Sequence, residues 1–217
     1  TRLGGIFHHG EGESRTLGAM PQRVAVEQSG RRERKIGGRG GVPELRDRRA
    51  VTPGGGCMHY RYLIVGGGMT GDAAVRGIRE VDERGTVGML CAEGHHPYNR
   101  PPLSKGLWKG QPEEQIWRDT PSLGAEVHTH RRAVSVDPFG HAVTDDRGQR
   151  YTFDRLLLAT GGSPKRLPFG GDDINYFRTF DDYRRLRKQS ALASRFVVLG
   201  GGFIGSEVAA ALAMNGK

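Results

Sequence analysis

Downstream of residue 58, apolar runs and helical spacings follow one another in a regular order. Residues 60–65 (YRYLIV) predict a buried strand that leads directly into a glycine-rich turn. Apolar residues then recur at i, i+4 and i+7 from Ala74, which predicts a helix that ends near Arg84-Gly85. Residues 86–92 predict a second strand. The order strand, helix, strand is typical of a βαβ unit in a parallel sheet.

More strands are predicted further along the chain. Residues 125–153 alternate between apolar and polar, and residues 145–148 (DDRG) predict a hairpin turn between two strands. Residues 152–161 follow, and their triple Leu at 156–158 predicts a fully buried strand. That strand ends at Ala-Thr-Gly, where small residues allow a bulky group to come close to the backbone.

The first pattern then starts again. Residues 195–199 (RFVVL) predict a strand, and residues 206–214 predict an alanine-rich helix with Asn215-Gly216 as its C-cap. The fold class is therefore α/β, with two Rossmann-like dinucleotide-binding folds. The second fold reaches Lys217 without its second strand, which would carry the residue that selects NADH or NADPH.

The turn after the first predicted strand has the spacing GxGxxG. Gly66 would permit the tight turn, Gly68 would let the backbone approach a pyrophosphate, and Gly71 would let the helix pack closely on the strand. Glu93 follows the second predicted strand, where its carboxylate can accept hydrogen bonds from ribose hydroxyls. The alternative is a glycine-rich turn with no ligand. The second GxGxxG, residues 200–205, makes the same prediction for a second dinucleotide.

Residues 1–57 differ from the rest of the chain. They are rich in Gly and Arg, lack a helix or strand period, and carry 11 Lys and Arg against 6 Asp and Glu. We expect a disordered basic extension, because such a segment cannot bury enough apolar surface to offset the entropy of ordering. A mis-extended reading frame is a second hypothesis, since Met58 stands directly before the first predicted strand. We expect domains at 58–170 and 171–217, the second incomplete.

Composition narrows the classes of function. The net charge is +9, and the basic excess is concentrated in residues 1–57, which favours a solvated tail over a nucleic-acid site. The two cysteines, Cys57 and Cys91, form no CxxC pair, so a reducing compartment and a cytoplasmic location are expected. No apolar run approaches the length of a membrane span. The histidine pairs lack metal-ligand spacing.

Residues 97–105 (PYNRPPLSK) resemble the ferredoxin-reductase and apoptosis-inducing-factor-like branch of the FAD-dependent pyridine nucleotide-disulfide oxidoreductases. The resemblance implies that Arg100 and Lys105 contact FAD, with Lys105 near the reactive edge of the flavin. A cation there would stabilise the anionic reduced flavin. The C-x4-C redox pair of the disulfide-reductase relatives is not present in this region. Cys91 is expected to be a small core residue.

The same resemblance extends to other segments. It implies that Ala133 gives a backbone contact to the adenine and that Thr160-Gly161 forms a second FAD signature. It also implies that Arg178 meets the FAD, although a surface arginine at a helix entry fits equally well. Glu207 would lie near the nicotinamide and pair with Lys105; the alternative is a first-turn Glu favoured by the helix dipole.

Two sets of cofactor-binding residues are thus expected. The FAD set is Gly66, Gly67, Gly68, Met69, Thr70, Gly71, Glu93, Arg100, Lys105, Ala133, Thr160, Gly161 and Arg178. The NADH or NADPH set is Gly200, Gly201, Gly202, Phe203, Ile204 and Gly205, with Lys105 and Glu207 as the expected catalytic pair.

The expected reaction is hydride transfer from NAD(P)H to FAD, followed by electron transfer to a ferredoxin- or rubredoxin-like carrier. Two other functions stay open: reduction of a small molecule such as oxygen, a peroxide or a quinone, and a redox-sensing interaction protein that NADH switches. A homodimer is open as well. The elements that would close the flavin side of the site are not found, so we expect this chain alone to retain FAD weakly and to be inactive.

Overall fold

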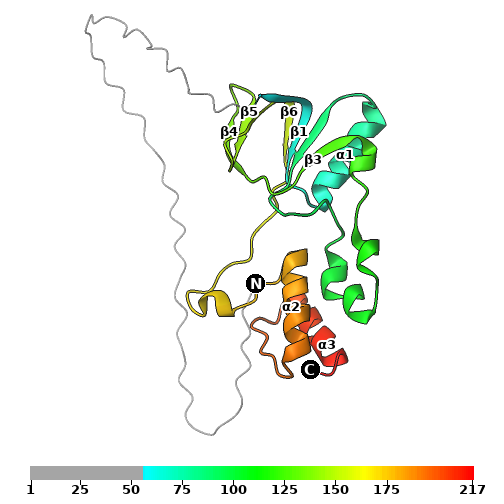
Figure 1. Cartoon of the computed structure of the whole chain (residues 1–217), viewed down its shortest axis with the longest axis vertical. Coiled ribbons are helices and arrows are strands. Elements are labelled where there is room, and N and C mark those ends of the chain that lie inside the picture. Colours follow the sequence, from blue (N-terminus) through cyan, green and yellow to red (C-terminus); the bar gives the residue numbers. More distant parts are fainter. Residues whose placement is uncertain (1–55) are drawn as a thin grey trace, which may run out of the picture. The chain divides into compact units, whose positions relative to one another are not determined.

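The structure, a computed structural model, describes residues 56–217, so the predicted basic extension lies almost entirely outside the described residues. A six-stranded sheet carries the fold (Figure 1). Its strands are β1 (Met58–Val65), β2 (Val87–Leu90), β3 (Ala125–His128), β4 (Ala133–Asp137), β5 (Ala142–Asp145) and β6 (Arg150–Leu158). The helices are α1 (Met69–Val81), α2 (Phe180–Leu192) and α3 (Phe203–Met214), with short 3-10 helices η1 (Pro101–Ser104), η2 (Gly106–Lys109), η3 (Glu113–Ile116), η4 (Pro121–Leu123) and η5 (Gly171–Asp173).

The strand order is β3-β2-β1-β6-β5-β4, and the first four strands run parallel. Val65, the last residue of β1, lies level with Leu90 of β2 and Leu158 of β6. Three strands therefore end side by side at one edge of the sheet. In an open parallel sheet, ligands bind outside such carboxyl ends at the point where the strand order reverses. Here that point lies between β2 and β6, at β1.

The two faces of β1 have different coverings. Ile64 packs with Val75 of α1, together with Val87 and Met89 of β2. Leu63 on the opposite face packs with residues of β5 and β6 instead. Burial on both faces explains why the carboxyl end of β1, residues 63–65, is a continuous apolar run, as strands of parallel sheets are. These elements confirm the predicted α/β class and the hairpin turn at 145–148, which joins β5 to β6.

Two predicted boundaries are wrong by a few residues. Helix α1 ends at Val81 and not near Gly85, because the carboxylate of Asp82 accepts hydrogen bonds from the backbone N–H groups of Arg84 and Gly85 and forms a turn. Strand β2 ends at Leu90, so Glu93 lies on the loop that follows and not at the strand end.

The predicted full burial of the triple Leu in β6 is also wrong. Leu157 and Leu158 are 40% and 59% exposed, because no element of the described residues covers this end of the strand. The predicted strand at 195–199 does not form either, and Val197 and Leu199 are largely exposed. A strand requires a hydrogen-bonded neighbour, and this segment has none among residues 56–217.

Helices α2 and α3 share a core with the chain around η1, η2 and η3. This cluster joins Phe180 and Tyr183 of α2 to Leu103, Trp108 and Leu212. A capping box begins α2, in which the Thr179 side chain and the Asp182 carboxylate each bond the other's backbone N–H. Helix α3 ends at Met214 with Asn215 as its C-cap, as predicted, and Gly216 follows in the left-handed region. None of the helices between residues 56 and 217 is long and apolar enough to cross a membrane.

Candidate dinucleotide-binding site

The segments that leave the carboxyl ends of β1, β2 and β6 line one groove of about 220 Å³. Most residues predicted to hold the first cofactor meet there. They are Gly66, Gly67, Gly68, Met69, Thr70, Glu93, Arg100, Thr160, Gly161 and Arg178, and Cys91, Ala92 and Ala159 complete the lining. Ligand pockets of about 300–1,000 Å³ are typical of whole small molecules, so this groove accommodates part of a dinucleotide.

The three motif glycines are required for different reasons. Gly66 has a φ of +126°, and a Cβ at this position would overlap the carbonyl oxygen of Ala159 at the end of β6. A Cβ at Gly71 would overlap the carbonyl oxygen of Gly66. At Gly68 a Cβ would meet no protein atom closer than Arg100 Nη2 at 4.0 Å. Gly66 and Gly71 are therefore needed by the fold, whereas the space beside Gly68 is open for a ligand.

Helix α1 points its N-terminus at this space. Gly68 is its N-cap, in an extended conformation, and no side chain caps the helix. The free N–H groups and the positive end of the helix dipole favour an anion such as a pyrophosphate. The groove thus fits the phosphate part of FAD by an open backbone, free donors and a favourable field.

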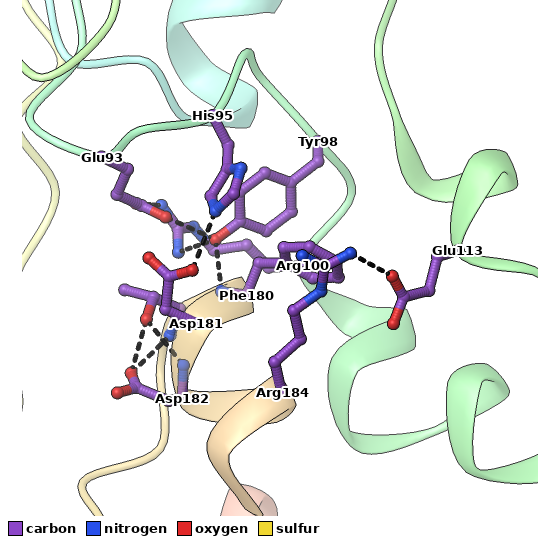
Figure 2. A network of polar contacts seen from close by, with 10 residues as sticks. Glu93, His95, Tyr98, Arg100, Glu113, Phe180, Asp181, Asp182 and Arg184 are labelled. Atoms are coloured by element: carbon purple, nitrogen blue, oxygen red, sulfur yellow. Dashed lines mark hydrogen bonds and ion pairs between the residues drawn. The ribbon is translucent and has the colours of Figure 1, made fainter. Parts of the chain in front are cut away.

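Glu93 and Arg100, which both line the groove, form an ion pair with one another (Figure 2). Arg100 Nη2 donates to Glu93 Oε1 at 2.5 Å, and the buried Tyr98 hydroxyl donates to Glu93 Oε2 at 2.6 Å. Burial and the bond to Glu93 raise the pKa of Tyr98, so the phenol stays a donor. A carboxylate offers about four lone-pair sites. Two are used here, which leaves capacity for ribose hydroxyls.

The same loop is tied to the start of α2. His95 Nε2 lies 2.9 Å from Asp181 Oδ1, and its ring packs edge-on against Phe180. Arg100 Nη1 also donates to the carbonyl oxygen of Arg178. Arg178 thus lines the groove next to Arg100, and the contact observed between them uses the backbone of Arg178. The contact of Arg178 with FAD stays a prediction.

Lys105 and Glu207 form an ion pair away from the groove. Lys105 Nζ lies 2.9 Å from Glu207 Oε1, and the buried Ser104 hydroxyl donates to Glu207 Oε2 at 2.6 Å. The bond from Ser104 and then the bond and charge of Lys105 lower the pKa of Glu207. The pairing expected from the sequence is present, and it joins η1 to α3. The catalytic roles of both residues stay predictions.

The second glycine motif repeats the geometry of the first. Gly200 has a φ of +113°. A Cβ at Gly205 would overlap the carbonyl oxygen of Gly200, just as a Cβ at Gly71 would overlap that of Gly66. Gly202 has open space around it, as Gly68 has. The motif borders an apolar cavity of about 810 Å³; of the predicted NAD(P)H residues, Gly200, Gly202, Phe203, Ile204 and Gly205 line it and Gly201 does not.

Ala133, which was expected to contact the adenine, lies elsewhere. Ala133 begins β4 and packs against the sheet core, and it does not line the groove. Cys91 is 1% exposed, as expected of a core residue, and burial raises the pKa of its thiol to about 12. The thiol therefore stays neutral and unreactive at ordinary pH.

Comparison with known proteins gives the same assignment as the geometry. The profile of the pyridine nucleotide-disulphide oxidoreductases matches residues 60–217, from the start of β1 to the last residue. The chain belongs to this family.

Several members resemble the chain closely. Terpredoxin reductase of Pseudomonas sp is 40% identical over 71% of this chain and 39% of its own length. Rubredoxin-NAD(+) reductase of Pseudomonas putida is 32% identical over 71% of this chain and 42% of its own. The crystal structure of the covalent putidaredoxin reductase-putidaredoxin complex matches with a TM-score of 0.66 at 30% identity, over 71% of this chain and 40% of that one. The chain thus spans about two fifths of the length of these family members.

Two residues of the site were missed by sequence reasoning. Tyr98 and Ser104 both lie within the PYNRPPLSK string that indicated the family, but their partners are distant in sequence. Tyr98 accepts from the Phe180 N–H, 82 residues away, and Ser104 bonds Glu207, 103 residues away. The string marked the segment, and only the fold shows what its hydroxyls touch.

Proposed function

We propose that this chain is the FAD-binding front part of an NAD(P)H-dependent oxidoreductase that passes electrons to a small carrier protein. The observation that carries the proposal is the meeting of three strand ends. The glycine turn after β1, Glu93 after β2 and Thr160-Gly161 after β6 line one groove at the N-terminus of α1. This arrangement suits the adenosine diphosphate half of FAD.

Backbone and side-chain groups of the groove would each bind a different part of FAD. Backbone N–H groups at the start of α1 would bind the pyrophosphate, Glu93 would accept from the ribose, and Arg100 would lie beside both. Lys105 would place a cation near the flavin, with Glu207 fixing its position through their ion pair. FAD, when bound, supplies the capacity to take a hydride and release single electrons. The protein contributes positioning and charge.

The second glycine motif supports a nicotinamide nucleotide as the hydride donor. Its turn and helix reproduce those of the first motif, with Gly202 open to a ligand. A small carrier protein is favoured as acceptor because several relatives are named as reductases of terpredoxin, rubredoxin or ferredoxin. We extend those names to this chain as part of the proposal.

Anaerobic stopped-flow spectroscopy tests the proposal. The protein is loaded with FAD and mixed with NADH or NADPH while its visible spectrum is recorded. Loss of the flavin bands, followed by their return on adding a ferredoxin or rubredoxin, would support the proposed function. Return of the bands with oxygen alone, at the same rate, would favour the small-molecule reductase. Bound flavin that neither nucleotide reduces would overturn the oxidoreductase assignment.

A further inference from the structure

The hydroxyl of Tyr98 forms hydrogen bonds with three groups. It donates to Glu93 Oε2 at 2.6 Å, and it accepts from Arg100 Nη1 at 3.1 Å and from the Phe180 N–H at 2.9 Å. A phenol has one donor and two acceptor sites, so its capacity is fully used. Figure 2 shows these bonds meeting between the loop and the start of α2.

The ring of Tyr98 holds the hydroxyl in place. The residue is 2% exposed and lies in the core cluster that joins α2 and α3. Its ring packs edge-on against Trp117, with centroids 5.7 Å apart, and at a tilt against Phe180, with centroids 6.0 Å apart. A ring fixed on several sides cannot swing its hydroxyl toward another partner. The phenol is therefore held in one position beside the side chains of Glu93 and Arg100.

The side chains of Glu93 and Arg100 both line the groove. Glu93 and Arg100 are about three quarters buried, and neither is fixed by a helix or strand of its own. Packing alone does not explain the hydroxyl, since Phe would fill the same volume in this aromatic cluster. What the hydroxyl adds is a fixed direction for the Glu93 carboxylate, with one oxygen bonded by the phenol and the other by Arg100.

We propose that Tyr98 is a positioning residue that orients the Glu93 carboxylate toward the ribose hydroxyls of the bound dinucleotide and links this contact to the start of α2. The proposal rests on the proposed function, because it takes the groove as the adenosine diphosphate site. Tyr98 itself does not line the groove. It acts through Glu93, so its effect must depend on the ribose hydroxyls.

The test measures ribose selectivity. ADP and 2′,3′-dideoxy-ADP are titrated into the ¹⁵N-labelled chain, and dissociation constants are taken from NMR shifts. The wild-type chain should prefer ADP. Tyr98→Phe should weaken ADP binding by about tenfold, the size expected for a lost hydrogen bond to a charged group. It should leave dideoxy-ADP binding nearly unchanged, so that the selectivity disappears.

Tyr151→Phe is the matched control. Tyr151 is 1% exposed, and its hydroxyl donates to the Asp145 carboxylate at 2.9 Å, away from the groove. This variant should keep the wild-type selectivity. The same spectra give a second readout, since the Phe180 amide should exchange with solvent faster in Tyr98→Phe than in the wild type.

Each other result would contradict the inference. If Tyr98→Phe keeps the wild-type selectivity, whether both affinities are unchanged or both are weakened equally, the phenol has only a structural role. If the wild-type chain does not distinguish the two nucleotides, Glu93 does not bind ribose, and the inference fails with it. Neither result decides whether the protein reduces flavin, which the stopped-flow experiment measures separately.

Discussion

Replacing Gly68 by alanine separates the needs of the fold from the needs of the ligand. The residue has φ −92° and ψ −173°, a region open to any amino acid, and its Cβ would have ordinary space. As an N-cap, alanine is less favourable than glycine by about 1 kcal/mol or less. Alanine also lowers the conformational entropy of the unfolded chain, which stabilises the folded protein by about 0.4–1 kcal/mol. The free energy of unfolding should therefore change by only about 0.5 kcal/mol.

Gly66→Ala, two residues earlier, is the comparison. Its φ of +126° is strained for alanine by about 1–3 kcal/mol, and overlap with the Ala159 carbonyl adds a further cost of about 1–3 kcal/mol. This variant should lose at least about 2 kcal/mol of stability. Urea unfolding followed by circular dichroism measures both variants against the wild type.

Ligand binding should show a different pattern from stability. The methyl group of Gly68→Ala would occupy the space open to the pyrophosphate and displace at least one hydrogen bond to a charged group. That loss corresponds to about tenfold or more in the dissociation constant of FAD, measurable by flavin fluorescence. Unchanged FAD affinity in a stable Gly68→Ala protein would refute the placement of the pyrophosphate. A destabilisation equal to that of Gly66→Ala would refute the steric reasoning.

Three further predictions concern other contacts of the structure. Asp72 is fully buried; burial alone would raise its pKa, but bonds from two arginines and a threonine outweigh this and lower it. The ionised carboxylate of Asp72 therefore stabilises the folded protein above its unfolded pKa near 4, and this stabilisation is lost as the pH falls below that value. Asp72→Asn should lower the free energy of unfolding in urea by about 3 kcal/mol at pH 7. It should also make the free energy of unfolding depend less on pH below about 4. Ser104→Ala should raise the pKa of Glu207 toward its ordinary value in a carboxyl NMR titration; an unchanged pKa would contradict the bond. A Cβ at Gly67 would overlap the Cys91 side chain, so Gly67→Ala should cost about 1–3 kcal/mol, and Cys91→Gly should recover part of this in a double-mutant cycle.

The sequence predicted the site best where function depends on local backbone geometry. Gly66 and Gly71 have the structural roles that the GxGxxG spacing predicted, because a tight turn and a helix start need only neighbours in the chain. The contact of Gly68 with a pyrophosphate stays a prediction. Glu93 and Thr160 line the same groove because parallel strands bring their carboxyl ends to the same edge, although Glu93 lies on the loop after β2. Their contacts with FAD stay predictions. Tyr98 and Ser104 were not predicted, since each forms a hydrogen bond with a residue on a helix more than 80 residues away.

The two glycine motifs show where local pattern stops determining structure. Residues 62–71 (YLIVGGGMTG) and 196–205 (FVVLGGGFIG) are nearly the same pattern, and both give a left-handed glycine and a helix with glycine at its N-cap. The first apolar run is a strand with a neighbour on each side, and the second is not a strand. The turn forms in both because its hydrogen bonds are local. The strand forms only where other segments supply the partners, so an apolar run predicts a capacity for pairing and the fold decides whether it is used.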